Sequence, residues 1–134
     1  MAIRNPESQL HHDHMIRQLV DNLIGKGYQE IRAAVLPEFT DMRPLRLYSD
    51  EAEMYFSPDV TALHNDNLML FEVETGDSIF APSTQVELRT FASYAAENQA
   101  SFYLVMSEQD RTLADATLEE IETRDLRRSF TITI

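Results

Sequence analysis

The fold of this chain is decided by Ser57-Pro58-Asp59-Val60 and by Phe71-Glu72-Val73-Glu74-Thr75, which follows after a short interval. Apolar residues flank both stretches, and the polar run His64-Asn65-Asp66-Asn67 lies between them. Apolar runs bounded by polar turn residues are typical of strands joined in a hairpin. The sequence therefore predicts two neighbouring strands that are buried on both sides and joined by a short turn.

Acidic residues gather along the second of these predicted strands. Because side chains point to alternate faces of a strand, Glu72 and Glu74 share one face while Val73 points to the other. The hairpin is expected to bring Asp59 alongside the two glutamates. Three carboxylates that converge in this way repel one another and raise their own pKa values unless a positive charge compensates. A divalent cation with oxygen ligands is the usual compensation in proteins.

The composition is that of an ordinary folded protein. The chain has 134 residues, of which 43% are hydrophobic and 25% are charged, so we expect a single domain over 1–134. No stretch reaches the length of a membrane-spanning helix, and the N-terminus lacks the apolar run of a signal peptide. The chain contains no cysteine, which excludes disulfides and thiolate metal sites. These features favour a cytoplasmic protein with no membrane partner.

The net charge of -12 bears on the kind of partner. Lys26 is the only lysine, and the arginines are scattered, with Arg127-Arg128 as the only adjacent pair. A protein that binds nucleic acid by neutralising phosphates is expected to show a basic stripe. This sequence shows none, although a salt-rich habitat would also produce a lysine-poor, acidic chain.

Hydrophobic periodicity and turn residues predict the order of elements. Ile16, Leu19 and Leu23 have the spacing of one helical face, and Gly25-Lys26-Gly27 is a natural helix stop. Pro82 and the spacing Thr84-x-x-Glu87, which fits a capping box, open a second helix. The predicted elements are a helix over 8–24, strands over 28–36, 53–63 and 68–75, a helix over 84–98, a strand over 101–107, a helix over 112–126 and an edge strand over 130–134.

Two parts of this prediction stay open. The segment 28–36 also allows a helix, and the connection over 37–50 allows a short strand at Leu45-Arg46-Leu47-Tyr48. The strand at 68–75, the helix at 84–98 and the strand at 101–107 form a β-α-β unit, whose strands should be parallel. We therefore expect an α/β fold with three layers, α-β-α, around a central mixed sheet.

The element order and the carboxylates together resemble the PD-(D/E)xK nuclease superfamily, which has the restriction-endonuclease-like fold. The motif is carried by Pro58-Asp59 and by Glu72-Val73-Glu74. The resemblance implies that Asp59 and Glu72 bind Mg²⁺ or Mn²⁺, with the Val73 carbonyl as a third contact. The position that usually holds lysine in this superfamily is Glu74 here, a substitution that some restriction enzymes share.

The function implied by the resemblance is metal-dependent hydrolysis of phosphodiester bonds in nucleic acid. DNA is favoured over RNA as the substrate, and the sequence leaves the choice open. Glu74 would accept a proton from the attacking water or hold a second cation. The helix that follows would send Gln85 and Arg89 into the site, with Arg89 on the phosphate. Thr75 and Ser78 could also line it.

Other interpretations of the same residues are open. The domain could have lost catalysis and serve as a binding or assembly subunit, or it could be an unrelated α/β protein whose acidic pair is structural. If it binds nucleic acid, a homodimer that gathers Arg43, Arg46 and Arg89, or a separate partner chain, would supply the basic surface. His11 and His14 could share a metal ion, although a solvated first helical turn is the commoner outcome.

Overall fold

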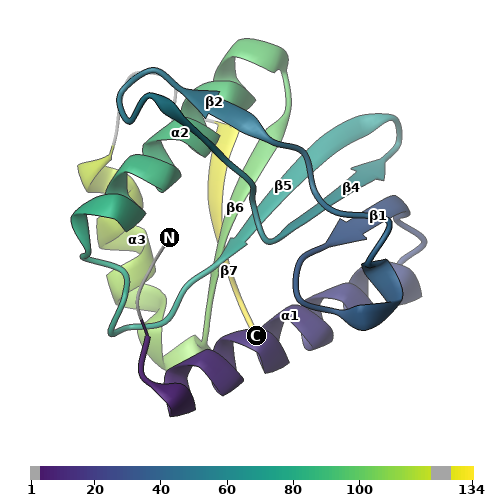
Figure 1. The fold of residues 1–134 in the computed structure, drawn as a ribbon, viewed down its shortest axis with the longest axis horizontal. Coiled ribbons are helices and arrows are strands. Elements are labelled where there is room, and N and C mark those ends of the chain that lie inside the picture. Colours follow the sequence, from purple (N-terminus) through teal and green to yellow (C-terminus); the bar gives the residue numbers. More distant parts are fainter. Residues whose placement is uncertain (1–3, 122–127) are drawn as a thin grey trace.

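The computed structural model describes residues 4–121 and 128–134 (Figure 1). Its helices are α1 (Pro6–Gly25), α2 (Pro82–Asn98) and α3 (Arg111–Glu120), with short 3-10 turns at Pro37–Phe39 and Glu108–Asp110. Its strands are β1 (Gln29–Ala33), β2 (Leu47–Ser49), β3 (Met54–Phe56), β4 (Val60–His64), β5 (Asn67–Val73), β6 (Ser101–Met106) and β7 (Ser129–Thr133). None of the described helices is both long and apolar enough to cross a bilayer.

The main sheet is mixed and has five strands in the order β1-β4-β5-β6-β7. The pairs β1–β4 and β4–β5 are antiparallel, whereas β5–β6 and β6–β7 are parallel. Because α2 connects the parallel strands β5 and β6, the predicted β-α-β unit is confirmed. The C-terminal strand lies at a sheet edge, also as predicted.

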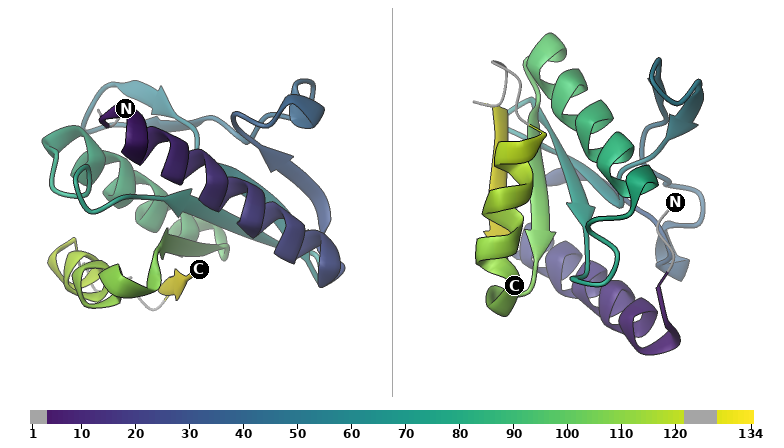
Figure 2. Two further views of the ribbon diagram at one scale, coloured as in Figure 1. Left: turned by 90° about the horizontal axis from the view of Figure 1, so that it is seen from below. Right: turned by 90° about the vertical axis from the view of Figure 1, so that its left-hand side faces the viewer.

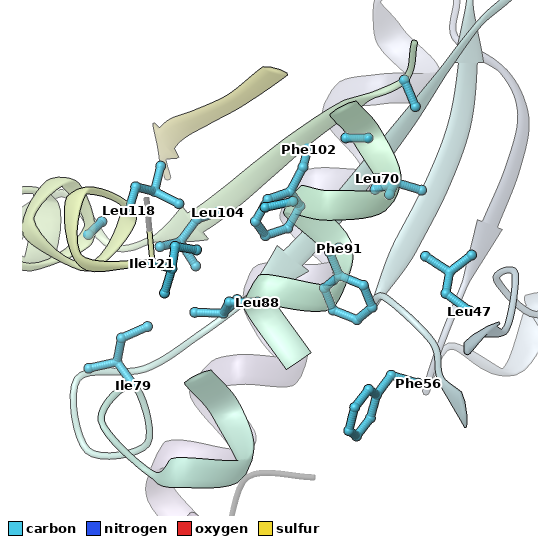
Figure 3. Close-up of a cluster of buried hydrophobic side chains, with 14 of the residues drawn as sticks. Leu47, Phe56, Leu70, Ile79, Leu88, Phe91, Phe102, Leu104, Leu118 and Ile121 are labelled. Atoms are coloured by element: carbon cyan, nitrogen blue, oxygen red, sulfur yellow. The ribbon is translucent and has the colours of Figure 1, made fainter. Parts of the chain in front are cut away.

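Helices cover both faces of this sheet (Figure 2). The side chains of α1 pack with one face of β4 and β5, in a buried cluster that includes Leu19, Phe71 and Val73. The opposite face packs against α2 and α3 through a second cluster, part of which is drawn in Figure 3. Strands buried on both faces explain the nearly continuous apolar runs of β5 and β6. The expected α/β architecture with helices on both sides of a mixed sheet is therefore confirmed.

The hairpin β4–β5 forms as the sequence predicts. Asn65 and Asp66 both have positive φ, 52° and 64°, which is the backbone of a two-residue turn that matches the twist of antiparallel strands. Asparagine and aspartate adopt this left-handed backbone conformation more readily than most other residues. Val60 pairs with Phe71, so the register places Asp59 across from Glu72, one step beyond the paired residues.

The predicted strand over 53–63 is wrong as a single strand, because the chain breaks at Ser57-Pro58-Asp59. Its first part, β3, pairs with β2 in a separate two-stranded sheet, and only β4 belongs to the main sheet. Pro58 has no backbone N–H to donate to a sheet ladder, which favours a break at this point. The short strand that the sequence allowed near Tyr48 is β2.

The predicted capping box at the start of α2 is also wrong. The helix begins at Pro82, with Ala81 as its N-cap and no side-chain cap hydrogen bond. Proline is favoured at the first helical position because its missing N–H would have no partner there. Thr84 therefore lies inside the first turn, buried, and Glu87 faces the site described below instead of the helix start.

Three further predicted boundaries also change. The strand predicted over 68–75 is β5 (Asn67–Val73), so Glu74 and Thr75 follow the strand and do not belong to it. The first strand covers Gln29–Ala33 rather than 28–36, and the helical alternative for this segment is excluded. The last helix, predicted over 112–126, is α3 (Arg111–Glu120), and its predicted continuation over 122–126, with Leu126, falls outside the described residues.

Candidate functional site

A cavity of about 420 Å³ lies where β5 ends, between the start of α1, the middle of α2 and the end of β3. Its lining includes the carboxyl groups of Asp59, Glu72, Glu74 and Glu87. The remaining lining residues are Arg4, Gln9, His12, Val35, Met54, Tyr55, Phe56 and Ser57. The structure thus brings together the three predicted acidic residues and adds a fourth from α2.

Asp59 and Glu72 extend the hairpin beyond its last paired residues. The Asp59 backbone N–H donates to Glu72 Oε1 at 3.0 Å, and the Val73 backbone N–H donates to Asp59 Oδ2 at 2.9 Å. Each carboxylate therefore accepts a hydrogen bond from the backbone of the opposite segment. These bonds orient both side chains toward the same point at the end of the sheet.

The two carboxyl groups also lie within hydrogen-bonding reach of each other. Glu72 is only 5% exposed, so burial raises its pKa well above the usual value. The negative charges of Asp59, Glu74 and Glu87 raise the Glu72 pKa further. Two facing carboxyl groups are compatible only when they share a proton or a cation. The pair is therefore a place where a positive charge lowers the free energy of the folded protein.

Glu74 follows the last residue of β5 and is 1% exposed. Its backbone N–H donates to Val105 O at 3.0 Å, which holds it beside β6. Ser78 Oγ donates to Glu74 Oε2 at 2.6 Å, and Arg4 Nη2 donates to the same oxygen at 3.0 Å. Burial nevertheless raises the pKa of Glu74 to about 7, because the hydrogen bond from Ser78 and the charge of Arg4 offset it only in part.

Arg4 is a site residue that the sequence analysis missed. Besides its ion pair with Glu74, it donates from Nη2 to Val73 O at 3.3 Å and from Nε to Thr75 Oγ1 at 3.1 Å. A cationic group thus lies beside Glu74, the residue that stands in the motif's lysine position. No local pattern marks Arg4, which is separated from Glu74 by 70 positions in the chain. The only available signal was the need for a positive charge among converging carboxylates.

His12 is the second residue that was missed. Its Nε2 lies 3.2 Å from Asp59 Oδ2, and its Nδ1 lies 2.9 Å from Asp13 Oδ1. Burial lowers the pKa of His12, but the hydrogen bonds and the negative charge of its acidic neighbours outweigh burial, so the pKa is raised. A sequence signal existed, because position 12 continues the inward-facing stripe of α1 through Ile16, Leu19 and Leu23.

The structure does not bring Gln85 or Arg89 into the cavity. Gln85 Nε2 donates to the backbone oxygen of Ile79 at 2.7 Å. Arg89 forms a two-pronged pair with Glu51, with contacts of 3.0 and 2.6 Å. An α-helix turns about 100° per residue, so residues two positions apart point to different sides. Glu87 lies two positions from both Gln85 and Arg89, and it is the α2 residue that meets the carboxylates. The expectation that these two side chains enter the site is therefore not supported by the geometry.

Of the remaining predicted side chains, two support the residues of the cavity and two histidines lie away from it. Thr75 and Ser78 are buried and bond to Arg4 and Glu74, respectively. His11 is exposed on the other side of α1, beside Glu7 and Asp77, and His14 is exposed too. The histidine of this run that reaches the acidic cavity is His12.

The donor set of the cavity fits a hard divalent cation, since carboxylate and carbonyl oxygens are the ligands that Mg²⁺ prefers. Among the described residues, no three His, Asp or Glu side chains form a group that could hold a metal ion as they stand. Arg4 lies on Glu74 and Val73 O, while His12 lies on Asp59. A cation that joins Asp59 to Glu72 would compete with these basic side chains.

The chain was compared with models of protein families, with curated proteins and with solved structures, and none of the three comparisons finds a match. The case for a function therefore rests on the cavity and its chemistry.

Proposed function

We propose that the protein is a metal-dependent nuclease-like hydrolase that cleaves phosphodiester bonds of nucleic acid at the acidic cavity. The observation that carries the proposal is the facing pair of Asp59 and Glu72 carboxyl groups, buried beside Glu74 and Glu87. A fold without catalytic or binding use for these groups would gain stability by replacing them, because buried and mutually repelling carboxylates are costly. The restriction-endonuclease-like resemblance supports the same assignment.

In this proposal Asp59 and Glu72 hold Mg²⁺ or Mn²⁺, with the Val73 carbonyl as a third oxygen. The bound cation would supply Lewis-acid polarisation of the phosphate and a lowered pKa for an attacking water. Glu74 accepts the proton of that water, because a carboxyl group with a pKa of about 7 is matched to proton transfer near neutral pH. As the water oxygen bonds to phosphorus, the bond from phosphorus to the leaving oxygen breaks.

Arg4 takes the part that the motif's lysine has in the resemblance. Its guanidinium group has five N–H donors in a planar fork, so it can keep a bond to Glu74 and offer another to a phosphate oxygen. His12 keeps Asp59 oriented through its contact at Nε2. The positive charge that the strand motif lacks at Glu74 therefore comes from the N-terminal segment, which packs beside it.

Metal binding is the first test. Isothermal calorimetry and thermal unfolding with Mg²⁺ and with Mn²⁺ should show binding and stabilisation in the wild type. Glu72→Gln should abolish both, while its amide oxygen still accepts the hydrogen bond from the Asp59 N–H and preserves the fold. Glu120→Gln, which removes one exposed charge from α3, is the matched control and should bind as the wild type does.

Cleavage is the second test. Single-stranded, double-stranded and branched DNA, with RNA of the same sequence, should be incubated with the protein and Mn²⁺. We expect cleavage of DNA that is lost in both Asp59→Asn and Glu72→Gln. Cleavage that survives in both variants would show that the assigned residues are not the active site.

A catalytically inactive binding or assembly domain is the second candidate. It is favoured by the pairs Arg4–Glu74 and His12–Asp59, which neutralise two of the carboxylates without any metal. If calorimetry shows no heat with millimolar divalent metal while Arg4→Ala destabilises the fold, this second candidate replaces the first. A homodimer stays a prediction. Arg89 is already paired with Glu51, so Arg43 and Arg46 are the cations that such a dimer could offer to a nucleic acid.

A further inference from the structure

The β2–β3 hairpin forms a small arm outside the main sheet. Figure 2 shows it on the side of the molecule away from α3 and β7. Leu47 and Phe56 anchor the arm, because both are buried in the cluster that surrounds Phe91 of α2 (Figure 3). Side chains alternate along a strand, so the residues next to these anchors face outward. The arm is therefore fixed to the body on one side and open on the other.

The open side of the arm carries aromatic residues. Tyr48 and Tyr55 are a cross-strand pair, 51% and 53% exposed, with ring centroids 5.2 Å apart and the rings at 70°. The Arg46 guanidinium lies over the Tyr55 ring, 4.5 Å from its centroid. We call the residues Arg46, Tyr48 and Tyr55 the aromatic face.

Exposed rings of this kind need an explanation, since their burial would stabilise the protein. The contact between Tyr48 and Tyr55 across the strands explains part of their position, but about half of each residue stays exposed to solvent. Aromatic rings with an adjacent arginine are the combination on which unpaired nucleobases stack. This points to a ligand with flat, exposed rings.

Three arginines on β1 and on the connection that leads from it to β2 are available for an anionic ligand. Arg32, Arg43 and Arg46 are exposed, and within the described ranges 4–121 and 128–134 none of them forms an ion pair. Arg32 and Arg43 donate only to backbone oxygens, of Arg43 and Ala33, at 3.4 and 3.0 Å. The arginines at positions 4, 17, 89 and 111 are, in contrast, all paired with acidic side chains. In a chain of net charge -12, this segment offers cations that no carboxylate neutralises.

The aromatic face is continuous with the acidic cavity. Met54 and Tyr55 belong to the cavity lining, with Phe56 and Ser57 leading directly to Asp59. Val35 lines the same opening and has a φ of 56°, a strained backbone for a β-branched residue that presents its side chain outward. A chain that lay on Tyr55 would therefore have its next units at the carboxylates.

We propose that the aromatic face binds unpaired nucleobases of a single-stranded nucleic acid and directs its backbone into the cavity. This rests on the proposed function and specifies its substrate class. A duplex fits less well, because its base faces are already stacked.

The test uses fluorescence anisotropy with a labelled oligothymidylate and with a hairpin duplex, at low salt and without divalent metal. Wild type should bind the single strand more tightly than the duplex. Tyr55→Ala should weaken single-strand binding by about tenfold, since stacking on one aromatic ring is worth about that much. Tyr55→Phe keeps the ring and should bind as the wild type does. Arg46→Ala should weaken binding and reduce its salt dependence.

The matched control is Phe130→Ala. It removes a partly exposed aromatic ring from β7, an edge strand of the main sheet that does not belong to the arm. It should leave single-strand binding unchanged. Because Tyr55 is exposed, Tyr55→Ala should also keep the thermal unfolding midpoint of the wild type. Unchanged affinity in a Tyr48→Ala, Tyr55→Ala double variant overturns the inference, as does equally tight binding of the duplex.

Failure of this inference is distinguishable from failure of the proposed function. Single-strand binding that depends on Tyr55 but comes without cleavage supports the aromatic face and overturns the catalytic proposal. Cleavage that Glu72→Gln abolishes but the double tyrosine variant preserves does the reverse. If analytical ultracentrifugation shows a dimer that Tyr55→Ala dissociates, and no oligonucleotide binds, the face is a contact between two copies and the inference is overturned.

Discussion

The carboxylates of this protein fall into two groups with opposite behaviour. On the surface, Glu38 and Glu51 are paired with Arg17 and Arg89, and hydrogen bonds from these arginines lower the pKa of each glutamate. In the cavity, burial raises the pKa values of Glu72 and Glu74, and their acidic neighbours add to the effect. The same residue type is thus stabilised in its charged form outside and in its protonated form inside.

This difference shows that the net charge of the chain is a poor guide to the protonation of its individual carboxylates. Surface carboxylates are solvated, and their pairs contribute little to stability. The cavity carboxylates are few, and two basic side chains, Arg4 and His12, contact them. A positive charge is therefore favoured most where the acidic groups are crowded, not where they are most numerous.

The largest expected effect follows from removing one charge from the crowded group. Glu72→Gln should lose detectable cleavage and all stabilisation by Mn²⁺, because a metal ligand disappears while the hydrogen bond to Asp59 N–H is kept. Even residues that only support metal ligands change activity by about 10- to 100-fold. Glu38→Gln, the same change on the surface, should leave both measurements as in the wild type. Equal effects of the two substitutions would remove the distinction between the groups.

The next effect is a dependence of stability on pH that comes from Glu74. Its pKa is raised from 4.5 in the unfolded chain to about 7 in the fold, so the native state binds more protons between these values. The contribution of Glu74 to stability is therefore complete below about pH 4.5 and is lost as the pH rises through about 7. A shift of this size corresponds to about 3 kcal/mol.

Urea unfolding of the metal-free protein at a series of pH values measures this loss. Glu74→Gln should lack it, so the variant should gain stability relative to the wild type as the pH rises from 4.5 to 7. Its amide oxygen can still accept the hydrogen bond from Ser78. Parallel pH profiles for the two proteins would mean that Glu74 titrates normally.

A smaller effect is expected from Arg4→Ala. Glu74 would lose its ion pair inside the protein, which should cost about 2 kcal/mol of unfolding free energy at pH 8 and raise the Glu74 pKa further. If Arg4 contacts the phosphate, the variant should also lose cleavage while it binds metal more tightly, because Val73 O is released. Intact cleavage in this variant would exclude Arg4 from the reaction.

The smallest effect belongs to the surface pair of Arg89 and Glu51. Arg89→Ala should leave the unfolding midpoint unchanged within error at physiological salt, because exposed ion pairs are screened. Cleavage should also be unchanged, since Arg89 lies outside the cavity lining. A large loss of activity in this variant would restore the role that the sequence analysis gave to Arg89.

The local parts of the fold and site were predictable. The burial of β5 on both faces, the turn at His64–Asn67 and the β-α-β order depend on residues close together in the chain, and the structure confirms them. Asp59, Glu72 and Glu74 were found for the same reason, because a hairpin fixes the relative position of its own side chains.

The predictions that were wrong concern how helices and strands rotate and pack against one another. The face of α2 that meets the cavity is set by how the helix packs through Leu88 and Phe91. This packing brings Glu87 to the cavity, in place of the expected Gln85 and Arg89. The split of the first hairpin strand depends on β3 leaving the main sheet to pair with β2. Neither event leaves a periodic signal in the sequence.

By itself, the order of residues determined that two acidic positions, one at the end of β5 and one just beyond it, turn to the same side of the backbone, since an extended chain alternates its side chains. Only the tertiary structure decided which cations accompany them, because Arg4 and His12 reach the cavity through packing of the N-terminal segment and α1 against β5. Charges that lie far apart along the chain meet only where the buried faces of helices and sheet are joined, and that meeting sets the pKa values on which the chemistry depends.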